Sequence, residues 1–217
     1  MTVLLREQVA EAARRLAHEG LLVGTAGNVS ATSGDLVGIT ASGVVLAGCR
    51  PDDVTVVTPT GSVVEGELAP SSELSLHLGV YADTDAAAVV HTHAPYSTAV
   101  ACVLEELPVV HYQQLLLGGA VRVAPYATFG TPELAEAVRG ALAGRQAALM
   151  ASHGSVAVGA SLPAAVDNAL LLEWLAALYH RASSLGTPKV LSPEEQDDVV
   201  RQAMSRNYGA PQELEAE

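Results

Sequence analysis

The sequence has few positive charges. It contains 11 Lys and Arg residues against 24 Asp and Glu, for a formal net charge of -13. Nucleic-acid binding draws its affinity from clustered Lys and Arg that neutralise phosphates, so this balance argues against a nucleic-acid partner. The single lysine, Lys189, lies beside a proline and outside any cluster that would lower its pKa for amine catalysis. Schiff-base chemistry is therefore not expected.

Cysteine and long apolar runs are also scarce. Cys49 and Cys102 have no metal-ligand spacing between them, and we expect free thiols without function. No uninterrupted stretch approaches the roughly 20 apolar residues that a membrane-spanning helix needs. Residues 1–20 intersperse charged and apolar side chains at helical spacing, which is typical of an amphipathic helix and not of a signal peptide. We therefore expect a cytoplasmic protein without a membrane partner.

The remaining composition fits one compact domain. Of the 217 residues, 49% are apolar, which is enough to bury one substantial core. No repeat or linker divides the chain, so we predict a single domain over residues 1–217. Helical and extended patterns alternate, and the turn formed by residues 59–61 before Val63 predicts a hairpin. We expect an α/β fold with a central mixed, mainly antiparallel sheet flanked by helices.

Periodicity and capping residues place the elements. Helices are predicted over residues 4–18, 72–81, 96–104 and 163–183, and from residues 132 and 193 onward, the last opened by a capping-box pattern at Ser192 and Glu195. Extended segments are predicted over residues 35–40, 54–58, 63–64, 86–90, 109–117, 121–124 and 147–152. The glycine-rich residues 24–30 are expected to form a loop.

Three histidines give the clearest chemical signal. In His91-Thr92-His93, the two-residue period of a strand points both imidazoles to the same side. The run before them, residues 86–90, is continuously apolar, so the pair is expected to be buried and to need partners. His153 follows another apolar run. Three neutral imidazoles leave an open coordination position, which is typical of catalytic zinc. From the spacing alone, the alternative of ordinary packed or half-exposed histidines stays open.

Several segments are suited to holding an anion without basic side chains. Residues 24–30 (GTAGNVS), 40–43 (TASG) and 71–72 (SS) are rich in glycine and small hydrogen-bonding residues, whose N–H groups can line an anion-binding concavity. The third segment lies at a predicted helix N-terminus, where a phosphate is favoured. Each is also typical of an ordinary turn. Glu73 follows directly and is the natural carboxylate for the metal site, although many glutamates at helix starts only complement the helix dipole.

Seven segments, in order and spacing, form a more specific pattern. They are GTAGNVS (24–30), ITASG (39–43), PSSE (70–73), VVHTHAPYSTAV (89–100), HY (111–112), APYATFGTPEL (124–134) and SHG (152–154). As a set they resemble the class II aldolase/adducin family, most closely its L-fuculose-1-phosphate aldolase branch, over nearly the whole chain. The loop after Ser30 and the acidic tail from residue 210 depart from that pattern.

The resemblance implies a set of roles for individual residues. One Zn²⁺ ion per subunit would be bound by His91, His93 and His153, and Glu73 would act as acid/base and also ligate the resting metal. The substrate phosphate would be held by Gly27, Asn28, Ser42, Gly43, Ser71 and Ser72. The active site would lie between subunits of a cyclic homotetramer, with Tyr112 and Tyr208 arriving from a neighbour as further catalytic residues.

The function implied by the resemblance is that of a zinc-dependent aldolase, a carbon–carbon lyase. It would reversibly cleave a ketose 1-phosphate into dihydroxyacetone phosphate and an aldehyde through a metal-stabilised enediolate, with Glu73 and Tyr112 moving protons. The alternatives are a 4-epimerase, decarboxylase or dehydratase of the same family, hydrolysis by metal-bound water, and a non-catalytic adducin-like assembly module. The epimerases carry Asp where Glu73 stands.

Overall fold

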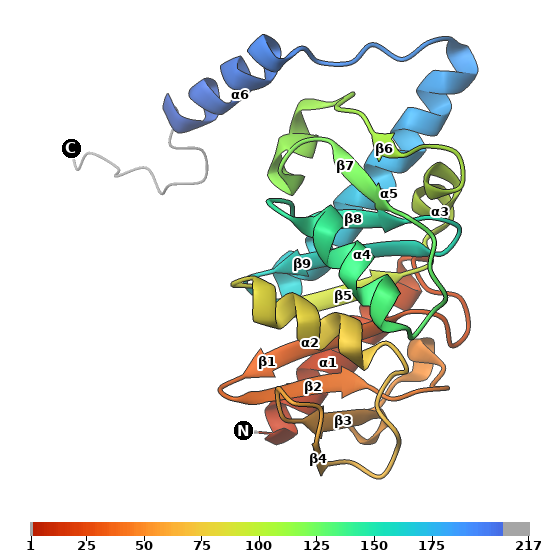
Figure 1. The fold of residues 1–217 in the computed structure, drawn as a ribbon, viewed down its shortest axis with the longest axis vertical. Coiled ribbons are helices and arrows are strands. Elements are labelled where there is room, and N and C mark those ends of the chain that lie inside the picture. Colours follow the sequence, from red (N-terminus) through yellow and green to blue (C-terminus); the bar gives the residue numbers. More distant parts are fainter. Residues whose placement is uncertain (1, 206–217) are drawn as a thin grey trace, which may run out of the picture.

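The computed structural model describes residues 2–205 and folds them around one large sheet (Figure 1). The strand order is β4-β3-β2-β1-β5-β9-β8-β7-β6. Neighbouring strands are antiparallel except β7 and β8, which are parallel, so the predicted mixed, mainly antiparallel sheet is confirmed. The strands are β1 Asn28–Ser33, β2 Leu36–Thr40, β3 Val54–Val57, β4 Val63–Glu65, β5 Ala88–Thr92, β6 Glu106–Leu107, β7 Val121–Ala124, β8 Ala147–Met150 and β9 Gly154–Gly159.

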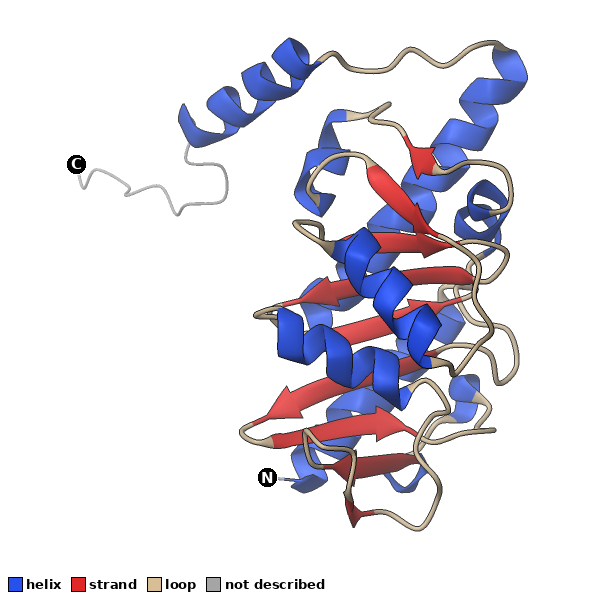
Figure 2. Cartoon of the chain, viewed as in Figure 1, coloured by secondary structure: helices blue, strands red, loops and turns tan. Residues whose placement is uncertain are grey.

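Helices cover both faces of the sheet (Figure 2). The α-helices are α1 Thr2–His18, α2 Leu74–Asp83, α3 Pro95–Ala101, α4 Pro132–Leu142, α5 Leu162–Leu185 and α6 Pro193–Ser205, and short 3-10 helices are η1 Leu46–Gly48, η2 Pro51–Asp53 and η3 Tyr112–Leu117. α2 and α4 pack beside each other on one face, while α1, α3 and α5 cover the other. The flanking helices predicted from the sequence are confirmed.

The central strand β5 shows how the two faces form the core. Ala88 and Val90 belong to the apolar cluster under α1 and α5, whereas Val89 belongs to the cluster under α2 and α4. Both faces of the strand are buried, which is why residues 86–90 read as a continuous apolar run. With the same alternation, His91 falls on the face of Val89, toward α2. The core therefore directs the first histidine to the side from which Glu73 approaches.

Three element predictions were wrong. Residues 28–33 form β1, a buried strand between β2 and β5, although a loop was expected through residue 30. Residues 112–117 form η3, ended by Gly118 at φ 93°, although an extended segment was expected. β9 directly follows His153 and was not predicted. The polar and glycine residues of β1 and β9 give little strand signal, whereas the sheet buries most residues of both strands.

The long helix α5 belongs to the core. Within residues 2–205, it is the one helix long and apolar enough to cross a membrane by length and composition. It packs against β9, β5 and α3, and its Leu172 and Leu175 are fully buried in the larger apolar cluster. Packing against the sheet therefore accounts for its apolar composition.

α6 extends away from the sheet and has no buried residue (Figure 1). Its predicted capping box is confirmed, because the Ser192 N–H donates to Glu195 Oε2 at 2.7 Å and the Glu195 N–H donates to Ser192 Oγ at 3.2 Å. Tyr208 lies outside the described residues. Cys49 and Cys102 are both free thiols, as predicted.

Candidate metal centre and active site

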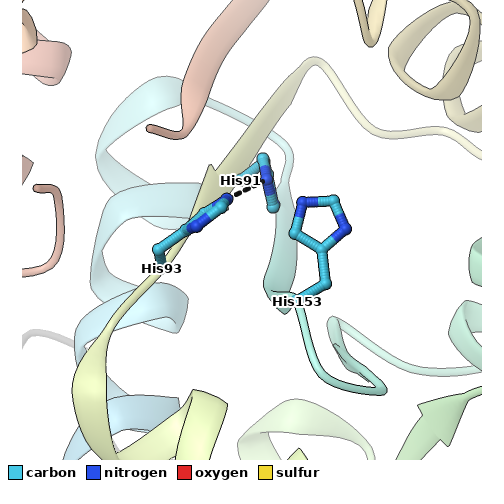
Figure 3. A group of neighbouring side chains, drawn as sticks. All are labelled: His91, His93 and His153. Atoms are coloured by element: carbon cyan, nitrogen blue, oxygen red, sulfur yellow. Dashed lines mark hydrogen bonds between the residues drawn. The ribbon is translucent and has the colours of Figure 1, made fainter. Parts of the chain in front are cut away.

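Three imidazoles converge at the end of the central strand. His91 lies in β5, His93 directly follows it, and His153 lies in the turn between β8 and β9 (Figure 3). His91 Nε2 and His93 Nε2 are 3.0 Å apart, and one ligand nitrogen from each of the three rings lies within 4.8 Å of the others. His91 is fully buried and the other two are partly exposed. The arrangement can hold a metal ion.

The backbone allows the β8–β9 turn to approach β5 closely. Ser152 adopts φ 54°, a conformation that non-glycine residues rarely accept. A Cβ on Gly154 would collide with the Thr92 carbonyl oxygen, so only glycine fits there. On the other side of β5, a Cβ on Gly27 would lie 2.7 Å from the His91 carbonyl oxygen. Both glycines let their segments reach the histidine-bearing strand.

Hydrogen bonding and burial prepare the rings as ligands. His91 Nδ1 lies 2.9 Å from the Ser155 carbonyl oxygen and donates to it, so in the neutral ring the lone pair of Nε2 faces the cluster. Burial, and then the like charge of His91, lowers the pKa of His93 to about 4. The pKa of His153 is lowered by the same causes. Neutral imidazole is the metal-binding form.

Glu73 completes the donor set. It precedes the first residue of α2 and is buried. Its Oε2 lies 3.1 Å from His91 Nε2 and accepts a hydrogen bond of 2.9 Å from Asn28 Nδ2. Its Oε1 lies 3.7 Å from His153 Nε2 and, among residues 2–205, has no hydrogen-bond partner. A buried carboxylate oxygen without a donor, beside three imidazoles, fits a divalent metal with nitrogen and oxygen ligands.

Electrostatics keep this carboxyl group ionised. Burial raises the pKa of Glu73, but the charge that His91 carries when protonated and the hydrogen bond from Asn28 outweigh burial and hold the pKa below its usual value. The group is therefore an acceptor for Asn28 and a negative ligand for a cation.

A cavity of about 340 Å³ opens beside the histidines. The residues predicted to hold a phosphate all line it, together with Glu73, His93 and His153: Gly27, Asn28, Ser42, Gly43, Ser71 and Ser72. The Ser42 and Ser71 N–H groups donate to the Ala69 and Thr40 carbonyl oxygens. Within the described part of the chain, the N–H groups of Gly43 and Ser72 have no protein acceptor. These two N–H groups can donate to an anion.

The two tyrosines expected to move protons are not brought into this cavity by the described part of one chain. Tyr112 begins η3, is 54% exposed, and packs beside His111 outside the cavity lining. Tyr208 lies beyond the described residues. Their arrival from a neighbouring subunit stays a prediction.

Sequence reasoning gave no role to two groups of residues at the site. Tyr126 and Phe129 line the cavity and expose apolar rings. His77 is fully buried beneath Asn28, with its Nε2 2.5 Å from Asn28 Oδ1. Its spacing of four residues from Glu73 on a predicted helix was an available signal, because such residues share a helix face.

Comparison with known proteins decides the family. The sequence model described as Class II Aldolase and Adducin N-terminal domain matches residues 7–180. The chain belongs to the class II aldolase/adducin family. The resemblance read from the seven sequence segments is confirmed.

Three class II aldolase relatives align over nearly their whole length. The 5-methylthioribulose-1-phosphate/5-deoxyribulose-1-phosphate aldolase of Rhodospirillum rubrum is 40% identical over 209 residues, 95% of this chain and 93% of that protein. The L-fuculose phosphate aldolase of Escherichia coli K12 is 39% identical over 207 residues, 94% of this chain and 95% of that protein. A solved structure of an L-fuculose 1-phosphate aldolase is 36% identical in sequence and superposes with a TM-score of 0.87. The match covers 92% of this chain and 96% of that chain.

The family assignment fixes the class of chemistry. This chain is a class II aldolase, a lyase that acts on carbon–carbon bonds. The class is metal-dependent, and the three convergent histidines are a group able to bind the ion. The alternative of a non-catalytic assembly module is set aside.

Proposed function

We propose that this class II aldolase uses Zn²⁺ to cleave a ketose 1-phosphate reversibly into dihydroxyacetone phosphate and an aldehyde. The observation that carries the proposal is the buried Oε1 of Glu73, which has no hydrogen-bond partner among residues 2–205. It lies beside three imidazoles, next to a cavity lined by the segments predicted to bind phosphate. The arrangement places an anion site, a cation site and a carboxylate around one small volume.

The phosphate anchors the substrate. The six residues predicted to hold the phosphate line the cavity: Gly27, Asn28, Ser42, Gly43, Ser71 and Ser72. Among residues 2–205, no lysine or arginine lines the cavity. Backbone donors, hydroxyls and the partial positive charge near the start of α2 therefore hold the phosphate. Anchoring the phosphate fixes the reacting carbons near Glu73.

Zn²⁺ would be held by His91, His93 and His153, with Glu73 as a fourth, displaceable ligand. When bound, the ion supplies positive charge beside the oxygens on which negative charge collects as the carbon–carbon bond breaks. Cleavage removes one proton from the C4 hydroxyl and adds one to C3, so Glu73, ionised in the resting site, takes up a proton equivalent to the one released at C4 and delivers it to C3 of the dihydroxyacetone phosphate half. In condensation Glu73 removes the proton from C3 again. Tyr112 and Tyr208 of a neighbouring subunit in a cyclic tetramer would handle the proton of the C4 hydroxyl.

We propose that the aldehyde end of the substrate packs against two aromatic rings. The rings of Tyr126 and Phe129 line the cavity and are 69% and 68% exposed. Such rings suit an aldehyde that ends in a methyl or methylthio group. The curated relatives are named for methylthioribulose, deoxyribulose and fuculose phosphates. We propose that the substrate of this cytoplasmic enzyme belongs to that group of ketose 1-phosphates.

Replacement of Glu73 by Gln tests the proposal. We expect Glu73→Gln to lower dihydroxyacetone phosphate release by about 10²- to 10⁴-fold, the range for loss of a general acid or base, while the three histidines retain zinc. The measurement is metal-dependent release from a panel of ketose 1-phosphates, with zinc content determined on the same samples. Glu136→Gln, an exposed site on α4, is the matched control.

Three outcomes would contradict the proposed reaction. Full cleavage by Glu73→Gln would remove the role of that residue. Release of free phosphate or of an acid without a matching aldehyde would indicate hydrolysis. Conversion of a ketose phosphate to its C4 epimer, or loss of carbon dioxide or water, would place the chain with the other enzymes of the family.

A further inference from the structure

A row of buried polar side chains leads from Glu73 away from the cavity. Asn28 Nδ2 lies 2.9 Å from Glu73 Oε2, and His77 Nε2 lies 2.5 Å from Asn28 Oδ1. Ser30 Oγ lies 2.6 Å from His77 Nδ1 and 2.6 Å from the Tyr81 hydroxyl. His77 and Ser30 have no exposed surface. Apart from Asn28 and Glu73, these residues do not line the cavity.

Two elements supply the row through their regular spacing. Asn28 and Ser30 are two residues apart on β1 and therefore point to the same face of the sheet. Glu73 directly precedes α2, and His77 and Tyr81 follow it in the helix at intervals of four residues. All three side chains therefore share one helix face. α2 covers this face of the sheet, and the two sets of side chains interdigitate.

The chemistry of the groups allows only one direction of hydrogen bonding. An ionised Glu73 only accepts, so the atom of Asn28 that faces it is the NH₂ group, and Oδ1 faces His77. Oδ1 also only accepts, so His77 Nε2 carries the proton and Nδ1 is an acceptor. The Ser30 hydroxyl then donates to Nδ1 and accepts from the Tyr81 hydroxyl.

The charge state of His77 supports this assignment. Burial, and then the positive character of His91, lowers the pKa of His77 to about 3 against the opposing effect of Glu73. A neutral ring has one donor and one acceptor nitrogen, which matches an amide oxygen on one side and a hydroxyl on the other.

We propose that His77 is a positioning residue for the aldolase reaction, held in its Nε2–H tautomer by Ser30 and Tyr81 so that the Asn28 amide always presents its NH₂ group to Glu73. The proposal rests on the proton-carrying role proposed for Glu73. With Oε2 bound by Asn28, the carboxylate is held in one rotamer and Oε1 stays free beside His153. A flipped amide would place two acceptor oxygens against each other and turn the carboxylate away.

The tautomer of His77 can be measured directly. In the full-length protein labelled with ¹⁵N histidine, with and without Zn²⁺, we expect the His77 ring to be protonated at Nε2 and unprotonated at Nδ1 from mildly acidic to mildly alkaline pH. The His77→Gln variant assigns the signal. An Nδ1–H tautomer would overturn the proposal, because Nε2 would then accept from the Asn28 NH₂ group and leave Oδ1 facing Glu73.

Kinetics separate positioning from packing. His77→Phe keeps a ring but loses both nitrogens, and we expect kcat to fall by about 10- to 100-fold, the equivalent of one lost hydrogen bond to a charged group, with KM for the sugar phosphate little changed. His77→Gln restores an amide donor toward Asn28 and should recover most of kcat. Tyr81→Phe should lower kcat in the same direction. Tyr179→Phe, on α5 and outside the row, is the matched control and should leave kcat unchanged.

Two kinetic results would overturn the proposal. One is an unchanged kcat in folded His77→Phe. The other is a kcat that is as low in His77→Gln as in His77→Phe. A role in packing alone would not depend on the hydrogen-bond donor that glutamine supplies and phenylalanine lacks. Failure of the proposed function would instead appear as cleavage activity in Glu73→Gln, so the two failures are distinguishable. If His77→Phe does not fold, the tautomer of the unmodified protein decides.

Discussion

At the residue scale, burial sets how the two thiols of this enzyme behave. Cys49 is fully buried at the end of η1, within the apolar cluster under α1. Burial, and then the negative charge of Asp53, raises the pKa of its thiol to about 11. The thiolate is the reactive form of cysteine, so Cys49 should be inert near neutral pH. Cys102, which caps α3, is exposed.

Alkylation should therefore distinguish the two cysteines. Near neutral pH, we expect a small thiol reagent to modify Cys102 in the folded protein and to leave Cys49 unmodified. Labelling of Cys49 should increase only as the pH approaches about 11. The same raised pKa makes the stability of the fold depend on pH. The raised pKa stabilises the fold below the unfolded value of 9.0, and this contribution is lost as the pH rises through about 11.

Peptide mass spectrometry after timed labelling measures both sites. The control is the denatured protein, in which both cysteines should react. Rapid labelling of Cys49 near neutral pH in the folded protein would contradict the predicted effect of burial.

At the element scale, the active site depends on how closely the β8–β9 turn approaches β5. Ser152 adopts a left-handed conformation, and Gly154 lies against the backbone of Thr92. All of β5 pairs with β9, from Ala88 with Gly159 to Thr92 with Ser155. This pairing places His153 beside the other two histidines. Any displacement of the turn should therefore move a metal ligand.

Gly154→Ala tests this dependence. The added methyl group meets the Thr92 carbonyl oxygen, which cannot move without disturbing the sheet. We expect the free energy of unfolding to fall by about 1–3 kcal/mol, the range for overpacking, and the affinity for zinc to fall with it. Urea denaturation and zinc titration measure the two effects.

The matched control is Gly140→Ala. Gly140 lies in α4, and a Cβ there meets no atom within 4 Å. Alanine should stabilise this helix by about 0.5–1 kcal/mol. Equal stability and zinc affinity in Gly154→Ala and the unmodified protein would show that the turn tolerates a wider approach.

The elements that the sequence predicted are those with strong local signals. β5 was predicted because both its faces are buried, and α4 because Thr131 caps a helix with proline at its first position. β1 was missed because Asn28–Ser33 is polar and small, and its polar groups are satisfied by residues of α2 and β5 far along the chain. No local sequence window contains those partners.

The residues of the candidate site also divide into those with a local sequence signal and those that depend on distant partners. His91 and His93 were predicted from strand periodicity, and His153, Glu73 and the phosphate segments gained their roles from the family pattern. His77 was not predicted, because its role appears only when α2 is placed over β1 and Asn28 Oδ1 meets its ring. Tertiary contact, rather than residue type, identifies it.

At the scale of the whole molecule, the candidate metal centre joins segments that are distant in sequence. His91 and His93 come from the central strand, and His153 follows β8 on the other side of β9 in the sheet order. The unfolded chain does not hold these three rings together, so an ion that binds them stabilises the folded state. Metal removal should therefore affect the stability of the entire fold.

Thermal unfolding with and without a chelator measures this coupling. With free zinc at 100 times its Kd, the stabilisation is about 2.7 kcal/mol, and each kcal/mol raises the Tm of a chain of this size by about 2–4 °C. We expect chelation to lower the Tm by about 5–10 °C and added zinc to restore it. His153→Ala should lose this response, and His18→Ala, at the exposed end of α1, should keep it. A Tm that is insensitive to chelation would contradict the role of the cluster.

The position of β5 between β1 and β9 also has a consequence for biosynthesis. As the chain leaves the ribosome, β1 and β5 can pair first, but His153 and β9 are made only after the β6, β7 and β8 segments. A nascent chain that ends before His153 therefore presents a two-histidine site with one flank of β5 unpaired. The complete three-imidazole site requires β9, so we expect tight metal loading to be confined to polypeptides in which β9 has left the ribosome.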